Sequence, residues 1–233
     1  MKIFKYNFNR GDGKTFTVRS LFAVSGYFDY DTDMSTPSKG KARPVSLIVL
    51  AGGTSRRMKQ DKVRLLVGTE PLIQKILKQV EGYFDEVLLS VSKGQTFDFV
   101  SCPQVEDECE GQGPLAGILS GLRAAAHDVC VVAACDIPDI DMAFIARMLE
   151  VSEDYEIVVP SSAEGTFEPL LAVYKKSVIP KIEKLLASSN RQVLALFDLC
   201  KTRVLKMGDS SWLKNLNTPE DYTEYLQSLR RKK

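Results

Sequence analysis

The chain has 233 residues, 44% of them hydrophobic, enough for one domain with a large buried core or for a domain with an appendage. Its 31 basic and 30 acidic side chains give a net charge of +1, so no overall field favours nucleic acid or an anionic membrane as a partner. No apolar stretch could span a bilayer or serve as a signal peptide and the five cysteines form no CxxC pair, so we expect a cytoplasmic protein with reduced thiols.

Residues 1–44 do not share the pattern of the rest of the chain. Residues 14–31 are rich in strand-forming side chains and predict one or two strands, whereas residues 31–44 have the proline, glycine and serine content of a linker. We therefore divide the chain into an amino-terminal appendage with its linker, residues 1–44, and a single domain, residues 45–233. The sequence does not reveal the role of the appendage, and a mobile tail fits it equally well.

From residue 45 onward, short β-branched runs alternate with helical patterns. The predicted strands are 45–51, 86–92, 129–135, 156–160, 169–174 and 202–207. The predicted helices are 71–84, 114–126, 142–150, 177–188, 191–199 and 219–232. The first three strands are almost continuously apolar, as strands covered by helices on both faces are. This alternation predicts an α/β fold with a mostly parallel sheet.

A glycine pair and a basic run follow the first predicted strand. Gly52 and Gly53 let the backbone approach a ligand, and consecutive N–H groups in such a turn can bind an anion. The cations that follow are Arg56, Arg57, Lys59 and Lys62. Because open α/β sheets bind ligands at the carboxyl ends of their strands, this loop is suited to a polyphosphate. Taken alone, the same run is equally well explained as a solvated basic surface.

A single aspartate, Asp136, directly follows the predicted strand 129–135. A carboxylate at that edge of the sheet suits Mg²⁺, with Mn²⁺ as an alternative, because Mg²⁺ binds one or two protein carboxylates together with substrate phosphates. A capping or turn role better fits Asp139 and Asp141, since Asp141 comes immediately before the helix at 142–150. We therefore predict that Asp136 holds the metal and that Asp141 caps the helix.

Five segments of the chain resemble the molybdenum cofactor guanylyltransferases in order and spacing. They are LAGGTSRRMKQDK, EDECEGQGPLAGILSGL, CDIPDID, FEPLLAVY and NLNTPEDY. The resemblance implies a Rossmann-like, three-layer nucleotidyltransferase fold and an enzyme that transfers GMP from GTP to the terminal phosphate of molybdopterin or of its molybdenum-loaded form. Pyrophosphate would be released, and the product would be the guanine dinucleotide cofactor. The sequence departs from the family pattern at Lys59, where relatives carry glycine.

The resemblance also implies roles for individual residues. The residues that it places against the nucleotide are Leu50, Ala51, Gly52, Gly53, Lys62, Ser90, Asp107 and Asp136. Among these, Lys62 would meet the phosphates, Asp107 would help to hold the guanine nucleotide, and Asp136 would ligate Mg²⁺. At the position of Ser90, relatives often carry asparagine. Asn215 and Asn217 would lie on the pterin side of the cleft.

The expected chemistry brings two polyanions together and needs no general base. Lys62, Arg57 and Asp136 with its metal would be the catalytic groups, because they lower the repulsion between the substrates and stabilise the charge on the leaving pyrophosphate. GTP and molybdopterin are the expected partners, with molybdoenzymes or cofactor-insertion proteins as candidates to receive the product. Neither nucleic acid nor a membrane is expected.

Two alternatives remain open at this point. One is a cytidylyltransferase of the same superfamily, although CTP-using relatives tend to read LAAG where this chain has LAGG, and many have aspartate in place of Asn217. The other is a non-catalytic nucleotide-binding module that has kept the fold. The presence of Lys62 and Asp136 argues against the second alternative.

Overall fold

The computed structural model describes residues 43–52, 62–108, 111–208, 210 and 212–231, together with the backbone of three strands nearer the start. Those strands are β1 (Phe4–Arg10), β2 (Lys14–Ser20) and β3 (Phe28–Asp31). β1 and β2 form an antiparallel hairpin, and β3 pairs in parallel with β12 (Thr202–Lys206) at the edge of the main sheet. The prediction of one or two strands within residues 14–31 is confirmed, and the domain boundary near residue 44 stays a prediction.

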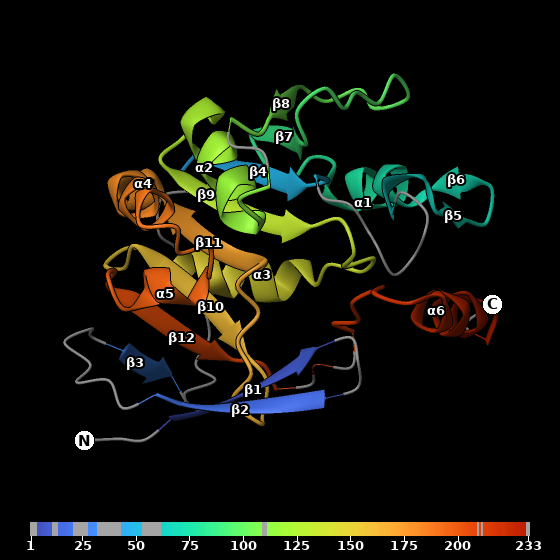
Figure 1. Cartoon of the computed structure of the whole chain (residues 1–233). Helices are drawn as coiled ribbons and strands as arrows, with labels where there is room; N and C mark the ends of the chain where they lie inside the picture. Colours follow the sequence, from blue (N-terminus) through green and yellow to red (C-terminus); the bar gives the residue numbers. More distant parts are fainter. Residues whose placement is uncertain are drawn as a thin grey trace.

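The main sheet has eight strands in the order β3, β12, β10, β11, β9, β4, β7, β8 (Figure 1). Their remaining bounds are β4 (Val45–Leu50), β7 (Glu86–Val91), β8 (Gln104–Glu106), β9 (Val129–Ala134), β10 (Ile157–Ser161) and β11 (Leu171–Lys175). All run in the same direction except β11, which is antiparallel to both of its neighbours. The connection from β10 to β11 is shorter than the dozen or more residues that a parallel crossover needs, so β11 returns as a hairpin strand.

Six α-helices occur where the periodicity predicts them, and they cover both faces of the sheet. They are α1 (Leu72–Val80), α2 (Pro114–Ala124), α3 (Met142–Glu150), α4 (Ile179–Ala187), α5 (Leu194–Phe197) and α6 (Pro219–Arg231). Helices α2, α4 and α5 pack on one face, and α1 and α3 pack on the other. The predicted helix at 191–199 is reduced to the short α5. No helix in the described part of the chain is long and apolar enough to cross a bilayer.

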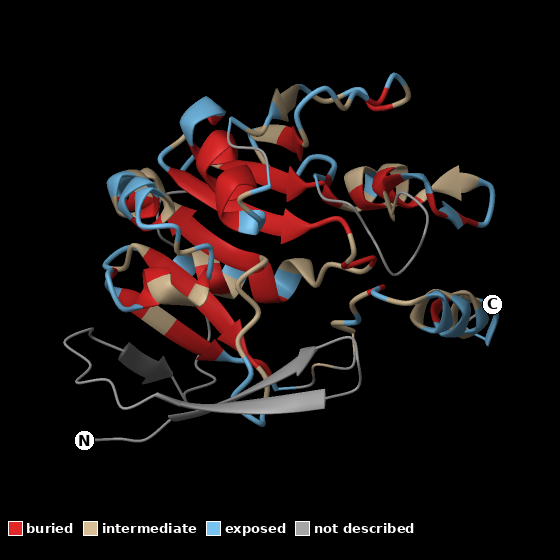
Figure 2. Cartoon of the chain, viewed as in Figure 1, coloured by how far each residue is buried: buried red, intermediate tan, exposed pale blue. Residues whose placement is uncertain are grey.

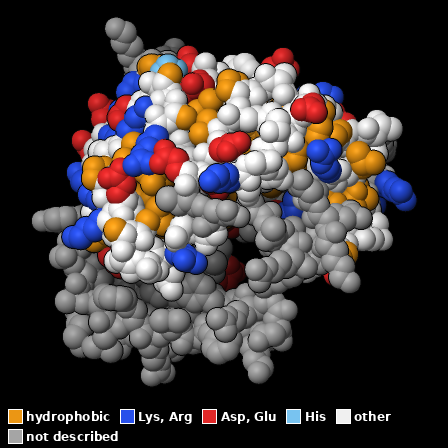
Figure 3. Space-filling view, turned by 45° about the horizontal axis from the view of Figure 1, so that its top comes forward, with side chains coloured by type: hydrophobic (Ala, Val, Ile, Leu, Met, Phe, Trp, Pro, Cys, Tyr) orange, Lys and Arg blue, Asp and Glu red, His pale blue; other side chains and the backbone are white. Residues whose placement is uncertain are grey.

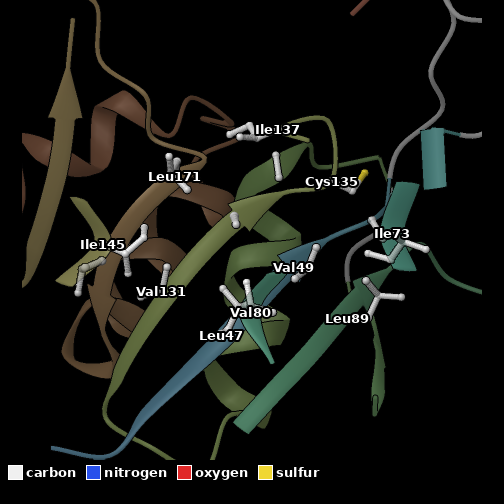
Figure 4. Close-up of a cluster of buried hydrophobic side chains, with 14 of the residues drawn as sticks. Leu47, Val49, Ile73, Val80, Leu89, Val131, Cys135, Ile137, Ile145 and Leu171 are labelled. Carbon is white, nitrogen blue, oxygen red and sulfur yellow. The ribbon is translucent and has the colours of Figure 1, made fainter. Parts of the chain in front are cut away.

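The core explains why the central strands are almost continuously apolar. In β4, Leu47 and Val49 face the α1 and α3 side (Figure 4), whereas Ile48 and Leu50 face the α2 side. Both sets are buried, so the inner strands of the sheet have no solvent-facing side chains in this region (Figure 2). The predicted three-layer α/β architecture with a mostly parallel sheet is confirmed.

The winding of the sheet reverses beside β4. The chain leaves β4 by α1 to reach β7 on one side, and it later returns by α2 to place β9 on the other side. The connections on the two sides of β4 therefore use opposite faces, which opens a crevice between the carboxyl ends of β4 and β9. The segment before α6 reaches this crevice because Tyr225 and Leu216 pack with Leu72 and Ile76 of α1.

Candidate active site

Three predicted site residues meet at the end of β9. The Lys62 ammonium donates to Asp136 Oδ2 at 2.8 Å and to Asn217 Oδ1 at 2.9 Å. Lys62 opens a one-turn helix, η1 (Lys62–Arg64), which is anchored by the buried Val63. The Lys62 and Asp136 side chains are only 16% and 21% exposed, so their charges are partly shielded from water. Two oxygens from distant segments thus converge on one cation.

Backbone contacts fix Asp136 and Asn217 in place. The Cys135 N–H donates to the Leu50 carbonyl at 3.0 Å, which ties the end of β9 to the end of β4. The Leu216 N–H donates to the Asp136 carbonyl at 2.8 Å, which brings the asparagine segment onto the same loop. Just beyond Asn217, the start of α6 is held by reciprocal hydrogen bonds between Thr218 and Asp221.

The other predicted residues gather around the ends of β4 and β7. The N–H groups of Ala51 and Gly52 both donate to the Ser90 carbonyl, at 2.8 and 3.1 Å. They therefore extend the pairing of β4 with β7 and are not the anion-binding N–H groups that the glycine pair suggested. The Ser90 hydroxyl is buried and donates to Asp107 Oδ1 at 2.9 Å. Ser90 thus supports Asp107, and direct contact of either residue with the nucleotide stays a prediction.

Burial also alters the ionisation of two carboxyl groups in this region. It raises the pKa of Asp107, and the hydrogen bond from Ser90 opposes part of that rise. Burial raises the pKa of Glu168 as well. The hydrogen bond from Asn215 lowers the Glu168 pKa, and the nearby negative charge of Asp136 raises it. Glu168 is therefore close enough to Asp136 for their charges to interact.

Two glycines allow close packing around Asp107. A Cβ added at Gly52 would lie 3.0 Å from the Ser92 nitrogen and 3.2 Å from Asp107 Oδ2. A Cβ added at Gly117, in the second turn of α2, would lie 2.9 Å from Ser90 Oγ and 3.3 Å from Asp107 Oδ1. Helix α2 can therefore approach the ends of β7 and β8 only because position 117 has no side chain.

Gly117→Ala should weaken nucleotide binding without unfolding the protein. The new methyl group would displace the Ser90–Asp107 pair, and we expect KM for GTP to rise about tenfold, consistent with ~1–2 kcal/mol of overpacking. Alanine is the better helix former, so stability should fall less than the overpacking alone implies. The matched control is Gly208→Ala, whose added Cβ meets nothing within 4 Å. Steady-state kinetics would contradict this view if the two variants had the same KM for GTP.

Part of the predicted phosphate loop cannot be placed. Gly53, Arg56, Arg57 and Lys59 lie within residues 53–61, outside the described residues, so their predicted roles stay predictions. By contrast, the capping role predicted for Asp141 is confirmed, because its side chain accepts from Ala143 N and Phe144 N at 2.9 and 3.1 Å. Asp139 instead pairs with Lys75 at 2.7 Å.

Known proteins share both the sequence pattern and the fold of this chain. Residues 47–203 match the model of the MobA-like NTP transferase domain. A probable molybdenum cofactor guanylyltransferase from Carboxydothermus hydrogenoformans is 32% identical over 78% of this chain and 95% of its own length. One from Pelotomaculum thermopropionicum is 34% identical over 75% of this chain and 88% of its own length. This chain belongs to the molybdenum cofactor guanylyltransferase family.

A solved structure supports the fold of this guanylyltransferase-family chain. The molybdopterin-guanine dinucleotide biosynthesis protein A from Archaeoglobus fulgidus superposes with a TM-score of 0.70 at 21% identity, over 80% of this chain and 99% of its own. The family assigned from the five sequence segments is therefore confirmed, and so is the class of enzyme, a nucleotidyltransferase. At 21% identity the structural similarity shows the fold alone.

Nucleotidyltransferases of this family typically use a divalent metal, and the residues around Asp136 fit one. No group of three His, Cys, Asp or Glu side chains gathers as a metal site within the described ranges. The carboxylate of Asp136 and the amide oxygen of Asn217 nevertheless converge on a single positive charge, that of Lys62. Hard oxygen ligands of this kind suit Mg²⁺, which completes its shell with substrate phosphates and water.

In this family member, charges of both signs are mixed over the face drawn in Figure 3, where a recess opens with acidic side-chain atoms inside it. Our residue-by-residue reading of the sequence assigned no role to Gly117 or Glu168. Both lie inside segments that carry the family resemblance, GPLAGILSGL and FEPLLAVY. A glycine inside a predicted helix and an acidic residue before a strand were the available signals, and neither names its neighbour.

Proposed function

We propose that this chain transfers GMP from GTP to the terminal phosphate of molybdopterin, or of its molybdenum-loaded form, and releases pyrophosphate. The observation that carries the proposal is the convergence of Lys62, Asp136 and Asn217 at the crevice between β4 and β9, in a chain that aligns with 95% of a curated guanylyltransferase. We place the reaction in the cytoplasm, with molybdoenzymes or cofactor-insertion proteins as the recipients of the product.

The proposed reaction is an in-line displacement at phosphorus. An oxygen of the acceptor phosphate attacks the α-phosphorus of GTP, and the bond between that phosphorus and the oxygen bridging to the β-phosphate breaks. Negative charge then builds on the pyrophosphate that leaves. The attacking oxygen is already anionic, so no side chain has to remove a proton from it. The work left to the protein is alignment and charge stabilisation.

The described residues divide this work between two sides of the crevice. Gly52, Ser90 and Asp107 form a close-packed wall at the ends of β4 and β7, which we assign to the guanosine. Lys62 brings a positive charge to the phosphates, as does Arg57 in our proposal. Asp136 would hold Mg²⁺ or Mn²⁺, and that ion would supply Lewis-acid charge to the phosphate oxygens. Asn215 and Asn217 would face the pterin.

The decisive experiment supplies molybdopterin and each of the four nucleoside triphosphates, labelled at the α-phosphate, with Mg²⁺ or Mn²⁺. We expect label from GTP alone to join the pterin, whereas label at the γ-phosphate should leave in pyrophosphate. A reaction without acceptor is the control. Preferential incorporation of CMP would identify a cytidylyltransferase, and nucleotide binding without transfer would identify a non-catalytic module. Either result would overturn the proposal.

A further inference from the structure

Glu168, which lies in the connection between β10 and β11, holds a residue of the site. Its Oε2 accepts a hydrogen bond from Asn215 Nδ2 at 3.2 Å. Asn215 Oδ1 is buried and has no hydrogen-bond partner in the part of the chain that the structure describes. The contact with Glu168 is therefore the one described hydrogen bond that orients the Asn215 side chain.

The anchor itself is fixed by the backbone. The Glu168 N–H donates to the Pro160 carbonyl at 3.0 Å, and the Glu168 carbonyl accepts from the Leu171 N–H at 3.2 Å. These bonds tie Glu168 to β10 and β11 on either side, and its carboxyl group lies largely within the protein. A side chain on so constrained a backbone can serve as a rigid point of attachment.

The anchored residue belongs to a tight turn that ends at the cation. The Asn217 N–H donates to the Asn215 carbonyl at 3.1 Å, and the Asn217 side chain accepts from Lys62. Asp136 is held separately, because Cys135 N–H bonds to β4 and Ile137 N–H bonds to the Ala134 carbonyl at 3.1 Å. Loss of the Glu168 contact should therefore move Asn217 more than it moves Asp136.

We propose that Glu168 is a positioning residue for the acceptor substrate: its carboxylate anchors Asn215 and so holds the turn of residues 215–217 that presents Asn217 to the pterin phosphate. This inference rests on the proposed function, in which Asn215 and Asn217 lie on the acceptor side. Glu168 does not touch the reacting atoms in this scheme. Its effect reaches them through Asn215 alone, so changes at residues 168 and 215 must be coupled.

The chemistry of the pair makes that coupling testable. An ionised carboxylate only accepts hydrogen bonds, so the amide nitrogen of Asn215 must face it. Asn215→Asp would set two carboxylates against each other and push the turn away. Adding Glu168→Gln to that change would restore a donor and an acceptor, with the glutamine nitrogen donating to the new aspartate. Glu168→Gln alone leaves an oxygen that can still accept from Asn215.

The test is a double-mutant cycle read out by the KM for each substrate. In Asn215→Asp we expect KM for molybdopterin to rise about tenfold, the equivalent of one lost hydrogen-bonded anchor, with KM for GTP within about twofold of wild type. In Glu168→Gln and in the double variant we expect KM for molybdopterin within about threefold of wild type. Glu164→Ala is the matched control, because Glu164 lies in the same connection but is exposed.

The outcomes separate this inference from the proposed function. If the wild-type protein transfers no GMP to molybdopterin, the proposed function fails. If wild type is active, equal rises in both KM values in Asn215→Asp, or no recovery in the double variant, overturn the role of Glu168 alone. Thermal unfolding is measured on all variants. If Asn215→Asp does not fold, Glu168→Ala replaces it, and an unchanged KM for molybdopterin in that variant overturns the inference.

Discussion

Lys62→Ala should lower the rate of guanylyl transfer by about two to three orders of magnitude while the protein remains folded. The ammonium is the described cation nearest to Asp136, and removing one preorganised charge from a phosphoryl transfer typically has an effect of about this size. The loss should appear in both kcat and KM for GTP, because the charge acts on bound phosphates and on the leaving pyrophosphate. Mn²⁺ binding to Asp136 should not weaken, since Lys62 is the positive charge that a metal has to displace or repel.

A second ion pair of the same kind provides the control for this substitution. Lys75 pairs with Asp139 at 2.7 Å, and its side chain is 17% exposed, compared with 16% for Lys62. Lys75→Ala therefore removes a similar lysine from a similar contact outside the proposed site. We expect it to reduce stability by about 1–2 kcal/mol and to leave transfer within about threefold of wild type. Equal losses of transfer in the two variants would show that Lys62 acts on stability and not on phosphates.

Asp136→Asn should lower transfer by about a thousandfold or more through loss of the metal. Asparagine keeps the shape of the side chain and can still accept from Lys62, but it removes the negative charge that attracts a divalent cation. We expect the affinity for Mn²⁺ in the presence of GTP, measured by electron paramagnetic resonance, to fall together with the rate. This measurement does not depend on turnover, so it separates metal loss from a general loss of activity.

Asp139→Asn is the matched control for Asp136→Asn. Asp139 accepts from Lys75 and from the Tyr225 hydroxyl at 2.9 Å, so the change should affect the packing of α6 and not the site. We expect normal Mn²⁺ affinity and a lower unfolding temperature in this control. Near wild-type transfer or Mn²⁺ affinity in Asp136→Asn would show that another group holds the metal.

Much of the fold could be predicted because its signals are local. Runs such as residues 45–50 and 129–134 are apolar on both faces, which indicates strands enclosed by helices whatever their partners are. Asp141 could be assigned as a cap because its two hydrogen-bond donors lie two and three residues along the chain. By contrast, the direction of β11 depends on its neighbours β9 and β10, and strand periodicity carries no information about direction.

The candidate site could be predicted only in part, because its contacts are long-range. Lys62 reaches Asp136 across 74 positions and Asn217 across 155 positions. The residues themselves suggested an anion loop and a metal carboxylate, and the family resemblance linked them. The use of the Ala51 and Gly52 N–H groups by Ser90 was not predictable, since the pairing of β4 with β7 decides which N–H groups remain for a ligand.

The amino-acid sequence therefore determined the layers of this protein, its family and the types of charge at its site, because hydrophobic periodicity and short motifs are written in neighbouring residues. Only the tertiary structure decided that Glu168 lies behind Asn215, that Gly117 must have no side chain and that Ser90 serves Asp107. Each of these facts depends on how closely two separate segments approach. That distance is set by the packing of the whole core, to which every element contributes.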